Sequence, residues 1–215
     1  MPIPPSIKIC GITTPSVVEA AIGARADHVG FVFFPRSPRA VTLREAASLA
    51  ERAGDRIGRV GLFVDPTDGE LAEATVAARL DAIQLHGSES PARAAAVRGQ
   101  FGLPVWKALP VASHADVAGA VRYADAVDLV LFDARTPGGT LPGGMGLSFD
   151  WTLLQAWRAP VAWGLAGGLD PDNVAEAIRQ TGAPLVDTSS GVESAPGAKD
   201  EARIASFCAA VRASG

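Results

Sequence analysis

Short apolar runs alternate along the chain with longer stretches in which apolar residues recur every three or four positions. Runs that are nearly continuous in apolar residues are typical of strands buried on both faces of a sheet, and the longer periodicity is typical of amphipathic helices. The predicted strands occupy residues 6–10, 28–33, 58–64, 81–85, 103–108, 127–133, 160–165 and 184–188.

Most of the predicted helices begin at a residue that can cap them. Serine, threonine and aspartate side chains accept hydrogen bonds from the first backbone N–H groups of a helix, and proline is favoured in its first turn. The predicted starts are Thr14-Pro15, Thr42, Asp65-Pro66, Ser88-Glu89-Ser90-Pro91, Ser113, Ser148 and Asp170-Pro171, and a last helix is predicted over residues 200–213.

Strands that are separated by helices indicate a parallel sheet covered by helices. Eight such units in 215 residues fit an α/β fold, a single-domain (β/α)8 TIM barrel that takes up residues 1–215. A doubly wound open sheet is the alternative, and eight repeats favour the closed barrel. No linker, low-complexity tract or block of charge argues for a second domain.

Composition limits the partners and the compartment. The net charge is −4 and no basic stripe is present, which argues against nucleic acid and acidic membranes. The two cysteines, Cys10 and Cys208, are too few and too far apart for a disulfide framework, which favours a reducing compartment. The first residues lack the features of a signal peptide, and no apolar run has the length of a membrane span. We therefore expect a soluble cytoplasmic protein.

Two titratable side chains stand at the ends of predicted strands, where both architectures place active groups. Cys10 ends the first run, and Asp133 ends the sixth. A thiolate can take a proton from an acidified C–H bond if a positive charge stabilises it, and Lys8 lies on the same side of the strand. A carboxyl group in apolar surroundings can hold a proton for donation. Each residue also has a structural reading, the cysteine as an apolar filler and the aspartate as a helix cap or ion-pair partner.

Glycine and small hydroxyl residues gather around the last three predicted strands, which indicates a phosphate site. Small residues let backbone N–H groups approach a phosphate, and the loops after strands seven and eight of such barrels commonly hold one. Ordinary turns require glycine as well. The candidate residues are Gly144, Gly146, Gly167, Gly168, Ser190 and Gly191.

Further polar residues add to the candidate site. Arg36 and Arg39 lie in a proline-containing loop after the second strand, where a guanidinium can bind carboxylate or phosphate. Lys107 lies in an apolar run and needs an anionic partner or a route to solvent. His86 follows the fourth strand and is a candidate for a further acid or base, although a structural or pocket-lining role is favoured. The histidines show no metal-ligand spacing, and no dinucleotide fingerprint or P-loop is present, so neither a metal nor a cofactor is expected.

A series of motifs runs in order over essentially the whole chain. They are Lys8-Ile9-Cys10-Gly11-Ile12-Thr13, Gly30-Phe31-Val32-Phe33, Ser37-Pro38-Arg39, Val60-Gly61-Leu62-Phe63-Val64, Gln84-Leu85-His86-Gly87, Leu131-Phe132-Asp133, Phe149-Asp150-Trp151, Ala166-Gly167-Gly168-Leu169 and Val186-Asp187-Thr188-Ser189-Ser190-Gly191-Val192-Glu193. Together they resemble phosphoribosylanthranilate isomerase of tryptophan biosynthesis.

The resemblance implies a TIM-barrel isomerase that needs no cofactor. Its reaction would convert the aminoaldose N-(5-phosphoribosyl)anthranilate into the aminoketose 1-(2-carboxyphenylamino)-1-deoxyribulose 5-phosphate. Asp133 would be the general acid that opens the ribose ring, and Cys10 the general base that takes the proton from C2′. Arg39 would hold the carboxylate of the substrate.

The resemblance also assigns the remainder of the pocket. The glycine and serine residues named above would cradle the phosphate through their backbone groups. Lys8 and His86, named above from the residues themselves, are counted among the substrate-binding candidates as well. Asp187 would lie at the pocket edge as a supporting polar residue. Met145 stands where the family usually has a small hydroxyl residue, so backbone contacts to phosphate are expected there in place of a side-chain contact.

Two other functions remain open from the residues alone. A pentose-phosphate epimerase on the same barrel would rely on metal-bound carboxylates and histidines, which this chain lacks in suitable places. A non-catalytic sugar-phosphate binding protein would use the glycine loops and Arg39 but would not need both Cys10 and Asp133. In each case the partner is a small phosphorylated molecule, and the protein is a monomer or a homodimer.

Overall fold

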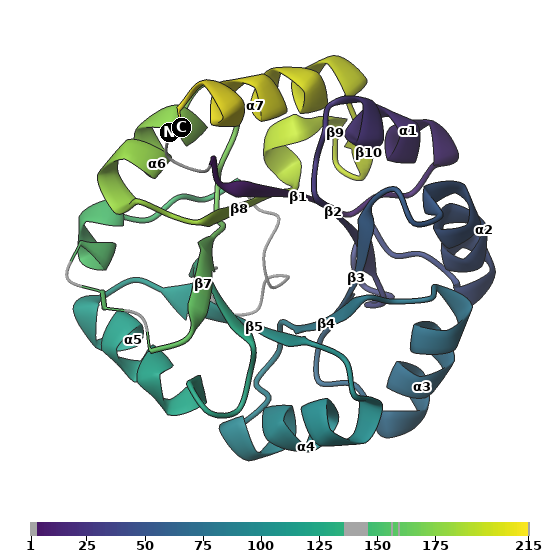
Figure 1. Cartoon of the computed structure of the whole chain (residues 1–215), viewed down its shortest axis with the longest axis horizontal. Coiled ribbons are helices and arrows are strands. Elements are labelled where there is room, and N and C mark those ends of the chain that lie inside the picture. The colour runs from purple at the N-terminus through teal and green to yellow at the C-terminus, as the bar shows by residue number, and fades with distance from the viewer. Residues whose placement is uncertain (1–3, 136–145, 156, 159, 215) are drawn as a thin grey trace.

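The computed structural model describes residues 4–135, 146–155, 157–158 and 160–214. Eight strands form a closed barrel in chain order, and every pair of neighbouring strands is parallel (Figure 1). The strands are β1 (Ser6–Cys10), β2 (His28–Val32), β3 (Gly58–Phe63), β4 (Ala82–Leu85), β5 (Val105–Val111), β6 (Leu129–Ala134), β7 (Ala162–Leu165) and β8 (Leu185–Thr188). The predicted (β/α)8 barrel is therefore confirmed, with strand ends that differ by a few residues from those predicted.

Helices form a ring around the barrel (Figure 1). They are α1 (Pro15–Gly23), α2 (Leu43–Ala53), α3 (Asp68–Ala77), α4 (Pro91–Phe101), α5 (His114–Gly119), α6 (Val174–Thr181) and α7 (Glu201–Ala213). Three short 3-10 helices, η1 (Ala120–Tyr123), η2 (Trp151–Leu154) and η3 (Ser190–Val192), lie in the connections. None of the described helices is long and apolar enough to cross a membrane.

Four of the predicted helix caps are confirmed. The side chains of Thr14, Thr42, Ser90 and Ser113 each accept a hydrogen bond from a backbone N–H in the first turn of α1, α2, α4 and α5. Since these side chains satisfy donors that the helix cannot pair internally, they fix where each helix begins.

Three predicted helix starts were wrong. Thr67, not Asp65, caps α3, because Thr67 and Glu70 form a capping box in which each side chain bonds the other residue's backbone N–H. Asn173 precedes α6, two residues beyond the predicted Asp170-Pro171 start. No helix begins at Ser148: Asp150 accepts hydrogen bonds from the backbone and hydroxyl of Thr152 and starts the short η2.

A small hairpin after β8 was missed by the sequence analysis. Strands β9 (Glu193–Ala195) and β10 (Ala198–Lys199) pair antiparallel, with Lys199 opposite Glu193. Two and three residues are too few to show the period-two pattern by which strands are predicted. The hairpin lies beside the carboxyl end of β8 and carries two charged side chains to the mouth of the barrel.

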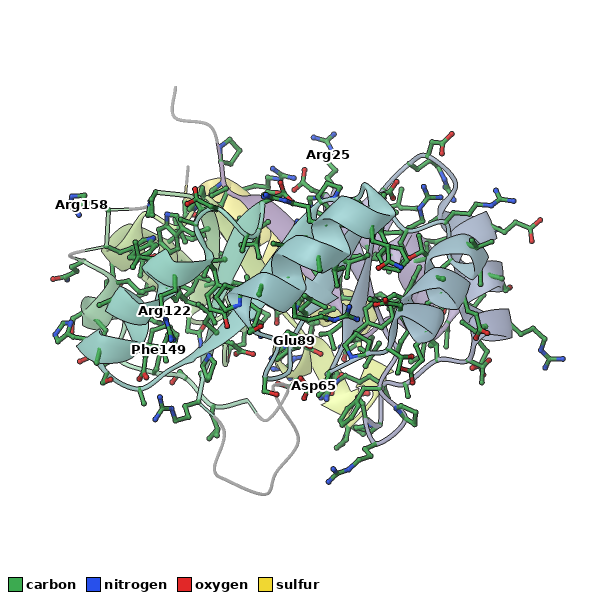
Figure 2. All side chains as sticks on the ribbon, turned by 90° about the horizontal axis from the view of Figure 1, so that it is seen from below. Arg25, Asp65, Glu89, Arg122, Phe149 and Arg158 are labelled. Atoms are coloured by element: carbon green, nitrogen blue, oxygen red, sulfur yellow. The ribbon has the colours of Figure 1, made fainter. Side chains whose placement is uncertain are left out.

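Apolar side chains fill the interior of the barrel. One cluster of buried residues contains Val60, Ala82, Trp106, Ala108, Leu129, Leu131, Ala166 and Leu185. A smaller cluster at the carboxyl ends of β1, β2 and β3 contains Cys10, Val32 and Leu62. The side view in Figure 2 separates the two ends of the barrel: Asp65 and Glu89, which follow β3 and β4, lie at one end, and Arg25, which precedes β2, lies at the other.

Cys208 lies on the buried face of α7 and gives the fold a specific pH dependence. Burial raises the pKa of its thiol to about 11. The unfolded chain releases this proton near the ordinary thiol pKa of about 8.5, so the folded state retains a proton that the unfolded state has lost. We therefore expect the free energy of unfolding to fall as the pH rises from about 8.5 towards 11, and to fall less steeply in Cys208→Ala. Urea denaturation of both proteins across this range measures the difference, and parallel curves would contradict it.

Candidate active site

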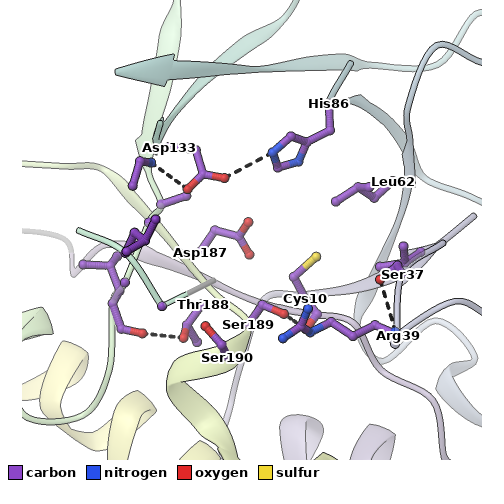
Figure 3. A pocket seen from close by; sticks show the side chains of 18 of the residues that line it. Cys10, Ser37, Arg39, Leu62, His86, Asp133, Asp187, Thr188, Ser189 and Ser190 are labelled. Atoms are coloured by element: carbon purple, nitrogen blue, oxygen red, sulfur yellow. Dashed lines mark hydrogen bonds and ion pairs between the residues drawn. The ribbon is translucent and has the colours of Figure 1, made fainter. Parts of the chain in front are cut away.

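A pocket opens at the carboxyl ends of the strands, with an empty volume of about 790 Å³ that includes its open mouth. Most of the predicted site residues lie on its wall: Cys10, Arg39, His86, Asp133, Gly146, Gly167, Gly168, Asp187 and Ser190. Figure 3 shows that the side chains of Cys10, Asp133 and Asp187 are directed into the same space. Gly144 and Met145 lie outside the described residues.

Cys10 is the last residue of β1 and is 4% exposed. Its sulfur has room because Gly30 lies beside it on β2: a Cβ at that position would come within 2.8 Å of the Cys10 Sγ. Burial raises the pKa of the Cys10 thiol, and the neighbouring Lys8 opposes this in the predicted direction without outweighing it. The resting side chain is therefore a neutral thiol that needs a further positive charge to become a base.

Lys8 and Asp187 form an ion pair beneath the pocket. The Lys8 Nζ lies 3.0 Å from both carboxylate oxygens of Asp187, its partner in the pairing of β1 with β8. Lys8 is fully buried and does not line the pocket, and its role in substrate binding stays a prediction. Asp187 does line the pocket, where barrel closure aligns it with Lys8, and its supporting role stays a prediction as well.

Asp133 is held in one orientation by two neighbours. Its Oδ1 accepts a hydrogen bond from the backbone N–H of Ala134 (2.8 Å), and its Oδ2 lies 3.1 Å from His86 Nε2. The amide nitrogen of Gln84 lies 3.3 Å from His86 Nδ1. A hydrogen bond donated by this amide leaves the imidazole proton on Nε2, where it is donated to Asp133. The side chain predicted as the proton donor thus has a titratable partner on its solvent side.

Gly167 provides the space that Asp133 needs. Its φ is +86°, a conformation that L side chains rarely adopt, and a Cβ there would lie 2.9 Å from Asp133 Oδ1 and 2.5 Å from the Ala134 nitrogen. Glycine therefore has a steric role beside the carboxyl group, in addition to the phosphate-binding role predicted from the sequence.

The loop that carries His86 is fixed by a second buried ion pair. Lys107 Nζ lies 3.0 Å from a carboxylate oxygen of Glu89 and donates to the carbonyl of Gly87 (2.7 Å). Glu89 in turn accepts hydrogen bonds from the backbone N–H groups of Asp65 and Gly87. Lys107 therefore has the anionic partner that its apolar surroundings required, and the pair holds the β4–α4 connection against the end of β3.

Arg39 lines the pocket and forms a paired contact with Glu193. Its Nε and Nη2 lie 2.7 Å and 2.8 Å from the two carboxylate oxygens. The aliphatic part of Arg39 crosses over Gly11 at the end of β1, where a Cβ would come within 2.6 Å of the Arg39 Cδ. Arg36, the other arginine of this loop, is exposed and lies over the ring of Phe34.

Gly11→Ala is expected to displace Arg39. The added methyl group collides with the arginine side chain, and the φ of +79° at this position is strained for alanine. We expect KM to rise about tenfold or more with a smaller change in kcat, since Arg39 is predicted to hold the carboxylate of the substrate and to take no part in proton transfer. Steady-state kinetics measures this, with Gly99→Ala as the control because a Cβ there meets nothing within 4 Å. An unchanged KM would show that Arg39 does not contribute to binding.

The predicted phosphate end of the pocket is built from small residues on three loops. Gly146, Gly168 and Ser190 line it, with Gly146 and Gly168 at φ of +68° and +63°. Asn173 donates a hydrogen bond to the carbonyl of Gly168 (2.8 Å) and so steadies this loop. Gly191 does not line the pocket. A Cβ there would lie 2.0 Å from the carbonyl oxygen of Leu169, so glycine is required at this position for the two loops to pack closely.

Four further residues near the site were not assigned a role from the sequence: Gln84, Ser189, Glu193 and Lys199. Ser189 lines the pocket, and its hydroxyl donates to the carbonyl of Cys10 (3.1 Å). Glu193 ends a matched motif, but its partner Arg39 lies 154 positions away, and no local pattern shows such a contact. No group of three histidine, cysteine, aspartate or glutamate residues in the described part of the chain is arranged to hold a metal ion.

Comparisons with known proteins identify the family of this chain. Residues 7–210 match the family described as N-(5'phosphoribosyl)anthranilate (PRA) isomerase. The N-(5'-phosphoribosyl)anthranilate isomerase of Zymomonas mobilis subsp. pomaceae is 52% identical over 206 residues, which cover 95% of this chain and 97% of that protein.

Solved structures give the same result. One, of monomers of the dimeric phosphoribosylanthranilate isomerase from Thermotoga maritima, superposes with a TM-score of 0.85 at 32% identity and covers 97% of this chain and 99% of that one. A phosphoribosylanthranilate isomerase in complex with reduced 1-(o-carboxyphenylamino)-1-deoxyribulose 5-phosphate superposes with a TM-score of 0.85 at 31% identity and the same coverage. The chain belongs to the N-(5'-phosphoribosyl)anthranilate isomerase family.

Proposed function

We propose that this protein converts N-(5'-phosphoribosyl)anthranilate into 1-(2-carboxyphenylamino)-1-deoxyribulose 5-phosphate, the isomerisation step of tryptophan biosynthesis. The observation that carries this proposal is the placement of a thiol and a carboxyl group on opposite sides of one pocket, in a chain of this family. The reaction is an Amadori rearrangement that moves protons within one substrate, so the atoms of substrate and product are the same.

Asp133 acts first, as the general acid. Its carboxyl proton passes to the ring oxygen of the ribose while the bond between that oxygen and C1′ breaks. The nitrogen lone pair forms the new C1′–N double bond, which gives an open-chain protonated Schiff base. His86 Nε2, at 3.1 Å, orients the carboxyl group towards the ligand.

Cys10 acts second, as the general base. The protonated Schiff base acidifies C2′, and its positive charge lies close to the sulfur, where it favours the thiolate. The thiol first releases its proton to water in the open pocket. The resulting thiolate takes the C2′ proton, and the electron pair of that bond forms a C1′–C2′ double bond as the nitrogen becomes a neutral amine. C1′ then takes up a proton from water while the C2′ hydroxyl proton passes to the carboxylate of Asp133, which completes the ketone and restores both side chains. Burial of the thiol suits this order, since Cys10 is basic only after the ring has opened.

The two ends of the substrate bind to opposite parts of the pocket. Arg39 holds the anthranilate carboxylate, because a guanidinium pairs with a carboxylate through two hydrogen bonds. The phosphate lies against Gly146, Gly168 and Ser190, where small residues let backbone N–H groups approach it. Gly144 belongs to the same proposed phosphate loop.

The remaining features of the proposal concern the whole protein. Residues 1–215 act as one catalytic domain without a metal or a cofactor, as a monomer or a homodimer. Its compartment is the cytoplasm, and the two unpaired cysteines, Cys10 and Cys208, suit a reducing environment.

The test is an assay with freshly prepared N-(5'-phosphoribosyl)anthranilate. We expect anthranilate-type fluorescence to fall as the substrate is consumed, at the same rate with and without a metal chelator. A protein that binds the reduced product analogue but does not accelerate this loss would be a sugar-phosphate binding protein. Activity that disappears with the chelator would contradict the metal-free mechanism.

A further inference from the structure

Glu193 is shared by two cationic side chains beside the pocket. Its Oε1 lies 2.7 Å from Arg39 Nε and also 2.7 Å from Lys199 Nζ. All three side chains are nearly inaccessible to solvent, with exposures of 9%, 4% and 0% for Arg39, Glu193 and Lys199. Charges that are withdrawn from water in this way are only weakly screened, so their sum determines what the site attracts.

Lys199 is held in a fixed position by the hairpin and by β8. The pairing of β10 with β9 places it opposite Glu193. Its ammonium group reaches three acceptors, the carboxylate of Glu193, the carbonyl of Ser189 (2.9 Å) and the hydroxyl of Ser189 (3.2 Å). An ammonium group has three N–H donors, so this geometry can satisfy all of them. Lys199 does not line the pocket and so cannot be a direct ligand contact.

The charges of Arg39, Glu193 and Lys199 do not cancel, and one positive charge remains. Arg39 and Glu193 alone would form a neutral pair, and a carboxylate arriving at a neutral pair gains little Coulomb energy. With Lys199, two positive charges face one negative charge, and the net charge is +1.

We propose that Lys199 is a positioning and specificity-determining residue: by sharing Glu193 with Arg39 it gives this end of the pocket a net positive charge, and so selects a substrate whose aromatic amine carries a carboxylate. The inference rests on the proposed function, because it takes the anthranilate carboxylate as the group that meets Arg39. It adds a residue that acts on the ligand only through Glu193 and Arg39.

The test compares two ligands that differ in one group. The first is reduced 1-(o-carboxyphenylamino)-1-deoxyribulose 5-phosphate, and the second is the same compound made with aniline, which lacks the carboxylate. The ratio of their dissociation constants, measured by calorimetry, reports on the carboxylate alone because both ligands share the phosphate and the sugar. In Lys199→Met we expect this ratio to fall on the order of tenfold, with little change in the affinity for the aniline compound. A variant that merely loosened the loop would weaken both ligands alike.

A second variant separates the effect of the net charge from the effect of the hydrogen bonds that Lys199 makes. The double variant Glu193→Gln/Lys199→Met removes one negative and one positive charge, which restores the net charge of +1 through Arg39. We expect its ratio to return to within about threefold of the wild-type ratio, although the hydrogen bonds of Lys199 are absent. Thermal unfolding of each variant confirms that the folded protein is being compared.

The outcomes distinguish this inference from the proposed function. If the wild-type protein binds neither ligand, or binds both equally, the proposed function fails. If the wild-type protein prefers the carboxylate ligand and Lys199→Met prefers it to the same degree, the role of Lys199 is refuted while the proposed function stands. Failure of the double variant to recover the preference would also refute the charge argument.

Discussion

Replacing Asp133 with asparagine is expected to lower kcat by about 10²–10⁴, the usual contribution of one positioned acid or base. An asparagine amide cannot release a proton to the ribose ring oxygen, so the ring would open only by the slow uncatalysed route. The side chains are nearly the same size, and the asparagine carbonyl oxygen can keep the hydrogen bond from Ala134, whereas its NH2 group cannot accept the one from His86 Nε2. We therefore expect the reduced product analogue to bind with little change, which a single-turnover assay and a titration would together establish.

Asp150→Asn is the matched control for this substitution. Asp150 is an exposed aspartate that caps η2 and does not line the pocket. Its replacement is expected to leave kcat unchanged. An Asp133→Asn protein with kcat close to wild type would refute the role of general acid and would direct attention to His86 as the proton donor.

Replacing Cys10 with serine is expected to lower kcat by a similar factor, about 10²–10⁴. A hydroxyl group is far less acidic than a thiol, so the positive charge of the protonated Schiff base cannot convert it into an effective base. Serine is smaller than cysteine, so it fits into the space beside Gly30 that the sulfur occupies. The loss should therefore appear in proton removal from C2′ and not in folding or binding.

A deuterium label at C2′ measures this directly. If proton removal has become rate-limiting in Cys10→Ser, the label should slow the variant several-fold. Cys208→Ala serves as the control, because Cys208 lies on α7 away from the pocket. Retention of most of the activity in Cys10→Ser would assign the base to another residue, and Asp187, which also lines the pocket, is a candidate.

The fold could be predicted because its strands are buried on both faces. Every strand of the barrel appeared as an apolar run. The errors concern where individual helices begin and strands end, because neighbouring residues there give competing sequence signals. Thr67 and Asp65 both precede α3, and the capping box with Glu70 decided between them. Strand β5 extends to Val111 beyond the predicted end, since its pairing with β6 continues past the apolar run.

The site could be predicted in part for a different reason. Cys10 and Asp133 stand at strand ends, and barrel geometry brings all strand ends to one mouth. Contacts between side chains that are distant in sequence could not be predicted. The partner of Lys8 is fixed by barrel closure, and the clustering of Arg39, Glu193 and Lys199 depends on a hairpin too short to leave a pattern.

The pairing of β1 with β8 also constrains how the chain reaches its active form. Lys8 and Asp187 are separated by 179 positions, so the lysine meets its counter-ion only when the last strand has joined the first. Until then an ammonium group in the barrel interior has no anion to offset its lost hydration, which costs several kcal/mol. We therefore expect an incomplete barrel, such as a nascent chain that still lacks its final quarter, to keep this ammonium group hydrated and the cavity around Cys10 unformed.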